Sequence, residues 1–250
     1  MARIPFAALR GEQGRFLVER HVISTAPSAN VLIRCAARDG AIERHDGLAL
    51  IVAPATTGMG ANGVLLAASR AEANRVGRAY ADAVVLEGAR ATRAAFLDRA
   101  AEARVIHFAG HAVAERTGVP RLVFAPEGRE AATLMHAEDI RTLRLPATRV
   151  VVLAACDSAS EARSVSSQGA SSLARAFLAA GVPLIIASQW EVEDDAAAAI
   201  SRLFHRSYGR GADPAAALRL AQLDLIARHR RVREWAAFAA IGGNHQQERR

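Results

Sequence analysis

The stretch Arg149-Val-Val-Val-Leu-Ala-Ala155 decides the fold class of this 250-residue chain. After its first residue it is continuously apolar and begins with three β-branched residues, which predicts a strand buried on both faces of a sheet. Three other short apolar runs, at 48–53, 104–109 and 183–188, have the same character. Strands of this kind are typical of parallel sheets that are covered by helices on both sides.

Helical patterns separate these apolar runs. We predict strands at 48–53, 83–86, 104–109, 121–125, 149–155, 183–188 and 235–241, and helices at 69–81, 92–103, 136–143, 169–180, 195–208 and 214–228. The first helix is expected to begin at Ser69, because Glu72 follows at the spacing of a capping box. Asp213 is expected to cap the last helix, with Pro214 in its first position. The alternation predicts an α/β domain of three layers with a mainly parallel central sheet.

Composition and charge exclude several classes of protein. With 51% hydrophobic and 23% charged residues, the chain is neither disordered nor collagen-like, and two cysteines build no disulfide framework. The formal net charge is +7, and the 32 basic residues, all arginine, are spread along the chain, so we expect no nucleic-acid partner. The sequence contains no apolar run of membrane-spanning length, and its first residues lack the apolar core of a signal peptide, so we expect neither a signal peptide nor membrane contact, and a cytoplasmic location.

Two potentially reactive side chains follow two of the predicted strands. His111 comes two residues after the strand at 104–109, and Cys156 directly follows the strand at 149–155. In parallel α/β sheets, chemistry takes place beyond the carboxyl ends of the strands. If these strands are neighbours, the imidazole can accept the thiol proton and later protonate a leaving amine. On spacing alone, the alternative that both are ordinary core residues stays open.

Several segments resemble those of one protein family. His107-Phe-Ala-Gly-His111-Ala and Val152-Leu-Ala-Ala-Cys156-Asp-Ser resemble the two signatures of CHAT-domain cysteine peptidases, a caspase-like family related to separase and the gingipains. Further segments resemble other motifs of that family in the same order, at 5–9, 26–28, 188–194, 213–222 and 235–242.

This resemblance implies both a fold and a function. The fold is a caspase-like three-layer sandwich, and the function is that of a cysteine endopeptidase that works through a thioester without a metal or cofactor. His111 is implied as the general base and Cys156 as the nucleophile, with oxyanion donors from the backbone of Cys156 and Ala112. The partners implied are a protein or peptide substrate and a TPR-type regulatory region or partner, in regulated bacterial signalling or defence proteolysis.

The resemblance also sets the expected domain boundaries and an alternative function. We expect one CHAT domain over residues 1–243 and a basic disordered tail at 244–250. The motif at 5–9 lies well inside the family's domain, so the first strand and helix of that domain are expected to be missing. Ala112 stands where the family has glycine. These two departures leave open a catalytically weak or inactive caspase-like module that binds other proteins.

Three residues are expected to contact the substrate: Asp157, Trp190 and Asp194. Asp157 directly follows the proposed nucleophile, and Asp194 belongs to the acidic cluster at 191–195. An acidic pocket at this edge would accept a basic side chain next to the cleaved bond. The alternative is that Asp194 caps the helix that follows and its acidic neighbours favour the helix dipole.

Two other patterns are given a structural interpretation. The glycines at 58–63 match the dinucleotide fingerprint, with Glu87 at the end of the next strand, but the helix predicted to begin at Ser69 lies too far from them to meet a phosphate. His107 is expected to be structural rather than a zinc ligand, and Cys35 to be a small buried residue.

Overall fold

The structure, a computed structural model, describes residues 4–42, 47–54, 63–110, 112–114, 120–127, 133–154, 166–190 and 192–243. Of the candidate site residues, His111, Cys156 and Asp157 lie outside these ranges. Ala112, Trp190 and Asp194 lie within them.

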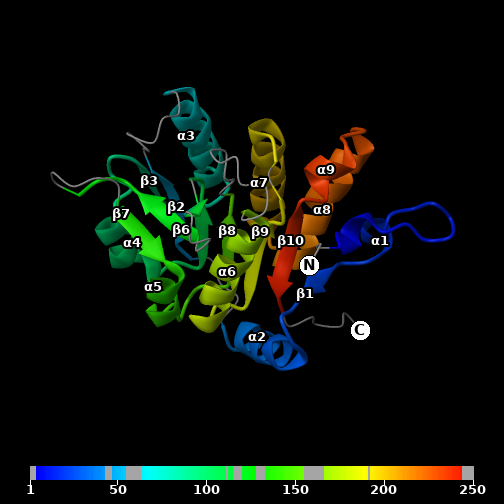
Figure 1. Ribbon diagram of the computed structural model, residues 1–250, viewed down its shortest axis with the longest axis horizontal. Coiled ribbons are helices and arrows are strands. Elements are labelled where there is room, and N and C mark those ends of the chain that lie inside the picture. Colours follow the sequence, from blue (N-terminus) through cyan, green and yellow to red (C-terminus); the bar gives the residue numbers. More distant parts are fainter. Residues whose placement is uncertain are drawn as a thin grey trace.

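Seven strands of the described residues form one mixed sheet, in the order β1-β10-β9-β8-β4-β2-β3 (Figure 1). They are Ser24–Thr25 (β1), Ala49–Pro54 (β2), Ala83–Gly88 (β3), Val105–Phe108 (β4), Val150–Leu153 (β8), Leu184–Ser188 (β9) and Phe238–Gly242 (β10). Every neighbouring pair is parallel except β10 with β9. The predicted α/β class with a mainly parallel sheet is confirmed.

Helices cover both faces of this sheet and make it the middle of three layers (Figure 1). One face carries α3 (Gly63–Gly77), α7 (Asp194–Tyr208) and α8 (Pro214–Ala227), and the other carries α4 (Arg93–Ala100), α5 (Ala137–Thr142) and α6 (Ser166–Ala179). Successive residues of β2 show how both faces become buried: Leu50 packs on the α4 side and Ile51 on the α3 side. A continuously apolar strand is needed because both of its faces are covered.

Further elements complete the fold: a 3-10 turn at Phe6–Ala8, α1 (Leu17–Arg20), α2 (Ala29–Ala41) and α9 (Val232–Trp235). The sequence analysis left α2 unassigned, although Ser28 marks its start: the Ser28 hydroxyl accepts a hydrogen bond from the backbone N–H of Val31 at 3.3 Å. Asp213 caps α8 as predicted, since its carboxylate accepts a hydrogen bond from Ala215 N at 3.1 Å. No described helix combines the length and hydropathy needed to cross a bilayer.

A second, antiparallel sheet lies between β4 and β8 in the sequence. It consists of β5 (Ala112–Ala114), β6 (Pro120–Phe124) and β7 (Thr133–His136). The strand predicted at 121–125 is therefore real but belongs to this smaller sheet. Its residues Leu122 and Phe124 are buried in the core cluster that also contains α4 and α6 residues.

Two predicted boundaries are wrong. Helix α3 begins at Gly63, six residues before Ser69, because the intervening Leu and Ala residues favour helix and outweigh the capping pattern read at Ser69. The last strand begins at Phe238 rather than Trp235, which is the final residue of α9. The Gln222 amide donates hydrogen bonds to the carbonyls of Trp235 and Phe238, both at 3.1 Å, and so holds the turn between them.

Candidate active site at the carboxyl edge of the sheet

The two strands that precede the proposed catalytic residues are neighbours. β4 and β8 pair in parallel, with Val105 opposite Val150 and Phe108 opposite Leu153, and Ala154 N donates to Phe108 O at 3.0 Å. Each pair in this register joins residues 45 apart in the sequence, and His111 and Cys156 are also 45 residues apart. Both strands therefore end at the same edge, and their last described residues on that side are Gly110 and Ala154.

Gly110 allows a close approach between the ends of β4 and β2. A Cβ atom at this position would lie 2.7 Å from Cε1 of Phe108 and 3.1 Å from Cδ of Pro54. The first of these distances is shorter than a carbon–carbon contact permits, and the Phe108 ring is fully buried. The glycine that precedes His111 therefore has a packing role at the candidate site.

The small sheet begins directly after His111. Ala112 is the first residue of β5 and pairs with Leu122 of β6. The residue expected to supply a backbone oxyanion donor thus belongs to a strand.

Trp190 is held by the start of the last strand and by α9. It follows β9, and its indole Nε1 donates a hydrogen bond to the carbonyl of Arg233 at 2.9 Å. The backbone N–H of Gln189 donates to Ala237 O at 2.7 Å. The ring is half-buried against the α7–α8 core, so the segment after β9 has a defined position at the edge.

Arginines at 230–233 form ion pairs with the acidic cluster. Glu193 lies 2.8 Å from Arg231, and Asp195 lies 2.7 Å from Arg230. The hydrogen bond from Arg230 lowers the pKa of Asp195. The sequence analysis missed these pairs, although the acidic run and the arginine run are complementary in charge.

Asp194 is not the cap of α7. It is the first helical residue, Glu193 occupies the cap position, and neither makes a side-chain capping bond. Asp194 and Asp195 both lie in the first turn, where the helix dipole favours negative charge. Asp194 is exposed at the candidate edge.

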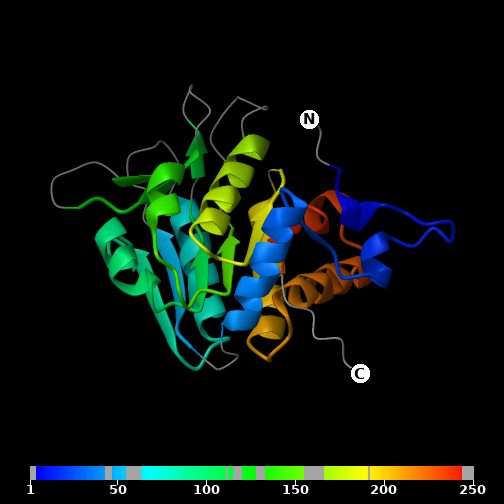
Figure 2. The same ribbon diagram turned by 90° about the horizontal axis from the view of Figure 1, so that it is seen from below.

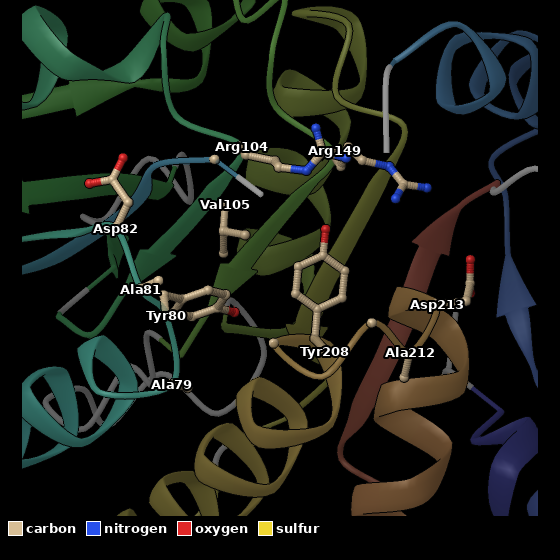
Figure 3. Close-up of a pocket in the computed structure, with 13 residues that line it drawn as sticks. Ala79, Tyr80, Ala81, Asp82, Arg104, Val105, Arg149, Tyr208, Ala212 and Asp213 are labelled. Carbon is tan, nitrogen blue, oxygen red and sulfur yellow. The ribbon is translucent and has the colours of Figure 1, made fainter. Parts of the chain in front are cut away.

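A hollow of about 260 Å³ lies beside Gln189, one residue before Trp190. The residues that line it are Ile4, Phe6, Thr25, Ala26, Pro27, Arg175, Gln189, Ala239 and Ile241. Most of these are apolar, and Arg175 is the charged one. A larger cavity of about 390 Å³ lies at the opposite edge of the sheet, beyond the amino ends of β4 and β8, with Arg104, Arg149, Tyr80 and Tyr208 in its wall (Figure 3).

The reason given above for setting aside a dinucleotide site is wrong in part. α3 begins at Gly63, next to the glycine pattern. However, the carboxylate of Glu87 is already bound, by Arg70 at 3.1 and 3.2 Å and by Asn74 at 3.1 Å. These donors lower the pKa of Glu87 and occupy the group that would have to hold a ribose.

His107 and Cys35 are both buried, as predicted. Burial raises the pKa of the Cys35 thiol, which opposes formation of a nucleophilic thiolate there. Within the described ranges, no group of three His, Cys, Asp or Glu side chains is arranged to hold a metal ion.

Comparison with known proteins identifies the family and the fold. A model of the CHAT domain matches residues 1–243. No curated protein sequence matches the chain.

Two similar solved structures are those of the Arg-specific cysteine proteinase gingipain R and of separase from Saccharomyces cerevisiae in complex with securin. The gingipain structure has a TM-score of 0.56 at 13% identity and covers 86% of this chain and 52% of its own. The separase structure has a TM-score of 0.56 at 13% identity, over 89% of this chain and 14% of its own. The likeness confirms the predicted caspase-like fold. This chain spans about half the length of the gingipain chain and a small part of separase.

Proposed function

This chain belongs to the CHAT-domain family, and from that premise we propose that it is a cysteine endopeptidase acting through His111 and Cys156. One observation carries the proposal: β4 and β8 are neighbouring parallel strands whose register joins residues 45 apart, the separation of these two residues. Continuing that register by three residues beyond Phe108 and Leu153 leads to His111 and Cys156. A general base and its nucleophile must come within hydrogen-bond reach, and neighbouring strand ends favour that.

The chemistry proposed is acyl transfer followed by hydrolysis. The Cys156 thiol gives its proton to the His111 imidazole, and the sulfur attacks the scissile carbonyl carbon. The oxyanion that forms accepts hydrogen bonds from the backbone N–H groups of Ala112 and Cys156. When the C–N bond breaks, the imidazolium protonates the leaving amine, and a thioester remains. A water molecule then gives a proton to His111 and attacks the thioester, which releases the acid and returns the proton to sulfur.

The substrate proposed is a protein or peptide that Asp157, Trp190 and Asp194 contact. Support comes from the bond between Trp190 and Arg233, which gives the segment after β9 a defined position. Because Glu193 and Asp195 are already paired with arginines, the acidic candidates for binding a basic substrate side chain are Asp157, Asp194 and Glu191. A TPR-type regulatory region or partner remains part of the proposal.

The alternative is a caspase-like interaction module without activity, which Ala112 in place of glycine favours. The strand position of Ala112 counts against it, because extended backbone is open to alanine as it is to glycine. Labelling with acyloxymethyl ketone peptides separates the two functions.

We expect such probes, carrying Arg, Lys, Asp or Leu next to the ketone, to label the native protein and the Cys35→Ser variant but not Cys156→Ala. The Cys156→Ala variant should keep its circular dichroism spectrum and lose peptide hydrolysis. Undiminished labelling or hydrolysis in that variant would reject the peptidase. A folded native protein that no probe labels at Cys156 would favour the interaction module.

A further inference from the structure

Four polar side chains form a continuous chain in the layer between the central sheet and helices α3 and α7. The Tyr80 hydroxyl lies 2.6 Å from Nδ1 of His205, and Nε2 of His205 lies 3.0 Å from Nδ1 of His107. At the far end, Nε2 of His107 lies 3.3 Å from Oε1 of Glu72. Glu72 belongs to α3, His107 to β4 and His205 to α7, and Tyr80 follows α3, so the chain joins segments that are distant in the sequence.

The surroundings of this chain are apolar. Both imidazoles are completely buried, among core residues such as Ile51 and Phe204. Nε2 of His107 and Oε1 of Glu72 have no hydrogen-bond partner among the described residues, and their mutual contact at 3.3 Å is an electrostatic one without hydrogen-bond alignment. Buried polar atoms without partners are unfavourable, so each member of the chain depends on the next.

The order of donors and acceptors follows from the chemistry of the end groups. A carboxylate at Glu72 can only accept, so His107 carries its proton on Nε2 and accepts at Nδ1. His205 must then donate from Nε2 and accept at Nδ1 the hydrogen bond that the Tyr80 hydroxyl donates. Burial and the neighbouring His107 hold the pKa of His205 well below its usual range, so this ring carries a single proton. The reversed order would require a protonated Glu72.

The chain connects the segments that border the proposed active site. His107 lies on β4, and His111 follows it four residues later in the sequence. Helix α7 begins four residues after Trp190, and α3 follows β2, so both helices start at the carboxyl edge of the sheet. Their other ends, near Tyr80 and Tyr208, reach the cavity at the opposite edge (Figure 3).

We propose that Tyr80, His205 and His107 form a one-directional hydrogen-bond chain, oriented at its far end by the carboxylate of Glu72, that locks both imidazoles as Nε2–H tautomers and positions β4 against α3 and α7. This inference rests on the proposed peptidase function. Tyr80 and Glu72 are positioning residues for hydrolysis, although neither lies at the carboxyl edge. The chain keeps the strand that leads to His111 aligned with the helix that follows the Trp190 segment. Misalignment of a reacting group by about 1 Å can cost two orders of magnitude in rate.

The test compares Tyr80→Phe with Tyr208→Phe. Both tyrosines line the same cavity, and only Tyr80 belongs to the chain, so the second variant is a matched control. In the native protein, imidazole ¹⁵N spectra should show His107 and His205 protonated on Nε2 and free of protons on Nδ1. Tyr80→Phe should shift the ring nitrogens of both histidines, and Tyr208→Phe should leave them unchanged.

Hydrolysis provides the second readout, because a merely structural role would lower the melting temperature without changing turnover. Tyr80→Phe should reduce kcat by about tenfold and change KM less than twofold, whereas Tyr208→Phe keeps kcat. Glu72→Gln, whose amide oxygen can still face the Nε2–H group of His107, should retain more activity than Glu72→Leu.

Two results would overturn the inference: an Nδ1–H tautomer in either ring of the native protein, or equal kcat for Tyr80→Phe and Tyr208→Phe. If the native protein hydrolyses no peptide and takes up no probe at Cys156, the proposed function fails and the positioning role fails with it. The ring spectra, which need no activity, still decide whether the chain and its direction exist.

Discussion

Arg149 and Asp39 form a buried ion pair that joins α2 to the strand preceding Cys156. Nε and Nη2 of Arg149 lie 2.8 and 2.5 Å from Oδ1 of Asp39, and both residues are almost inaccessible to solvent. Arg149 comes directly before β8, and Asp39 lies in the last turn of α2, which runs alongside the sheet and ends near that end of it (Figure 2). The pair therefore anchors the amino end of the strand whose carboxyl end leads to the proposed nucleophile.

Breaking this pair should destabilise the protein strongly. Asp39→Asn leaves a buried guanidinium without its counter-charge, and we expect the free energy of unfolding in urea to fall by about 3–5 kcal/mol. Replacing both partners, as Asp39→Leu with Arg149→Met, should recover most of that loss, because neither partner of the pair is then left as an uncompensated charge. In the exposed pair of Arg228 with Asp224, Asp224→Asn should have no measurable effect. A single variant at Asp39 as stable as the native protein would contradict this account.

Gly110 should tolerate no side chain. Gly110→Ala places a methyl group against the buried Phe108 ring and against Pro54, and we expect a loss of about 1–3 kcal/mol together with reduced hydrolysis. Gly11→Ala is the control, because a Cβ at Gly11 meets nothing within 4 Å. Thermal unfolding and peptide assays on the two variants measure the difference, and equal effects would show that the contact at Gly110 is unimportant.

The buried His205 should make the protein sensitive to acid. Its native pKa is lowered by burial and by His107, whereas in the unfolded chain it is about 6.5. Between these two values the unfolded state binds a proton that the native state does not, so stability falls as pH drops below about 6.5 and the loss ends at the native pKa. The slope in this window is at most about 1.4 kcal/mol per pH unit.

Urea unfolding between pH 7.5 and 5 measures this slope. His205→Gln should lower stability at neutral pH and flatten the curve below pH 6.5, while His21→Gln, which changes an exposed imidazole, should leave the slope as it is. An unchanged slope in His205→Gln would mean that other groups cause the acid sensitivity.

Preference for a basic substrate should depend on Asp157 rather than on Glu193. Glu193 is already paired with Arg231, so Glu193→Gln should leave cleavage after arginine nearly unchanged. Asp157→Asn should reduce kcat/KM for arginine substrates by more than about tenfold relative to leucine substrates, because a desolvated charge pair is lost. A panel of arginine, lysine, aspartate and leucine peptides provides the measurement. Cleavage after aspartate alone would exclude an acidic pocket.

The class of fold was predictable because burial on both faces leaves a direct trace in a strand such as 149–155. The residue at which a helix begins leaves a weaker trace in the sequence. Ser69 and Glu72 have the spacing of a cap, yet α3 begins six residues earlier, since helix-forming residues on both sides of Ser69 favour continuation. Glu72 instead faces His107, a tertiary contact that no local pattern reveals.

The strands that lead to the candidate site were predictable from the sequence, but the side-chain contacts around the site were not. The positions of His111 and Cys156 after two apolar runs led to β4 and β8, which are indeed neighbours. The pairing of Arg230 with Asp195 and of Trp190 with Arg233 depends on α9 lying beside the start of α7. Such long-range packing is decided by the whole core rather than by residues near these positions.

Among the described residues, the small sheet β5-β6-β7 forms no ladder with the central sheet, although it lies between β4 and β8 in the sequence. The alignment of β4 with β8 rests on their own ladder, so it does not depend on how many residues the small sheet contains. We therefore expect that 113–136 can be exchanged for the matching segment of another protein with this fold, provided that the buried positions Leu122 and Phe124 stay apolar, while β4 and β8 keep their pairing.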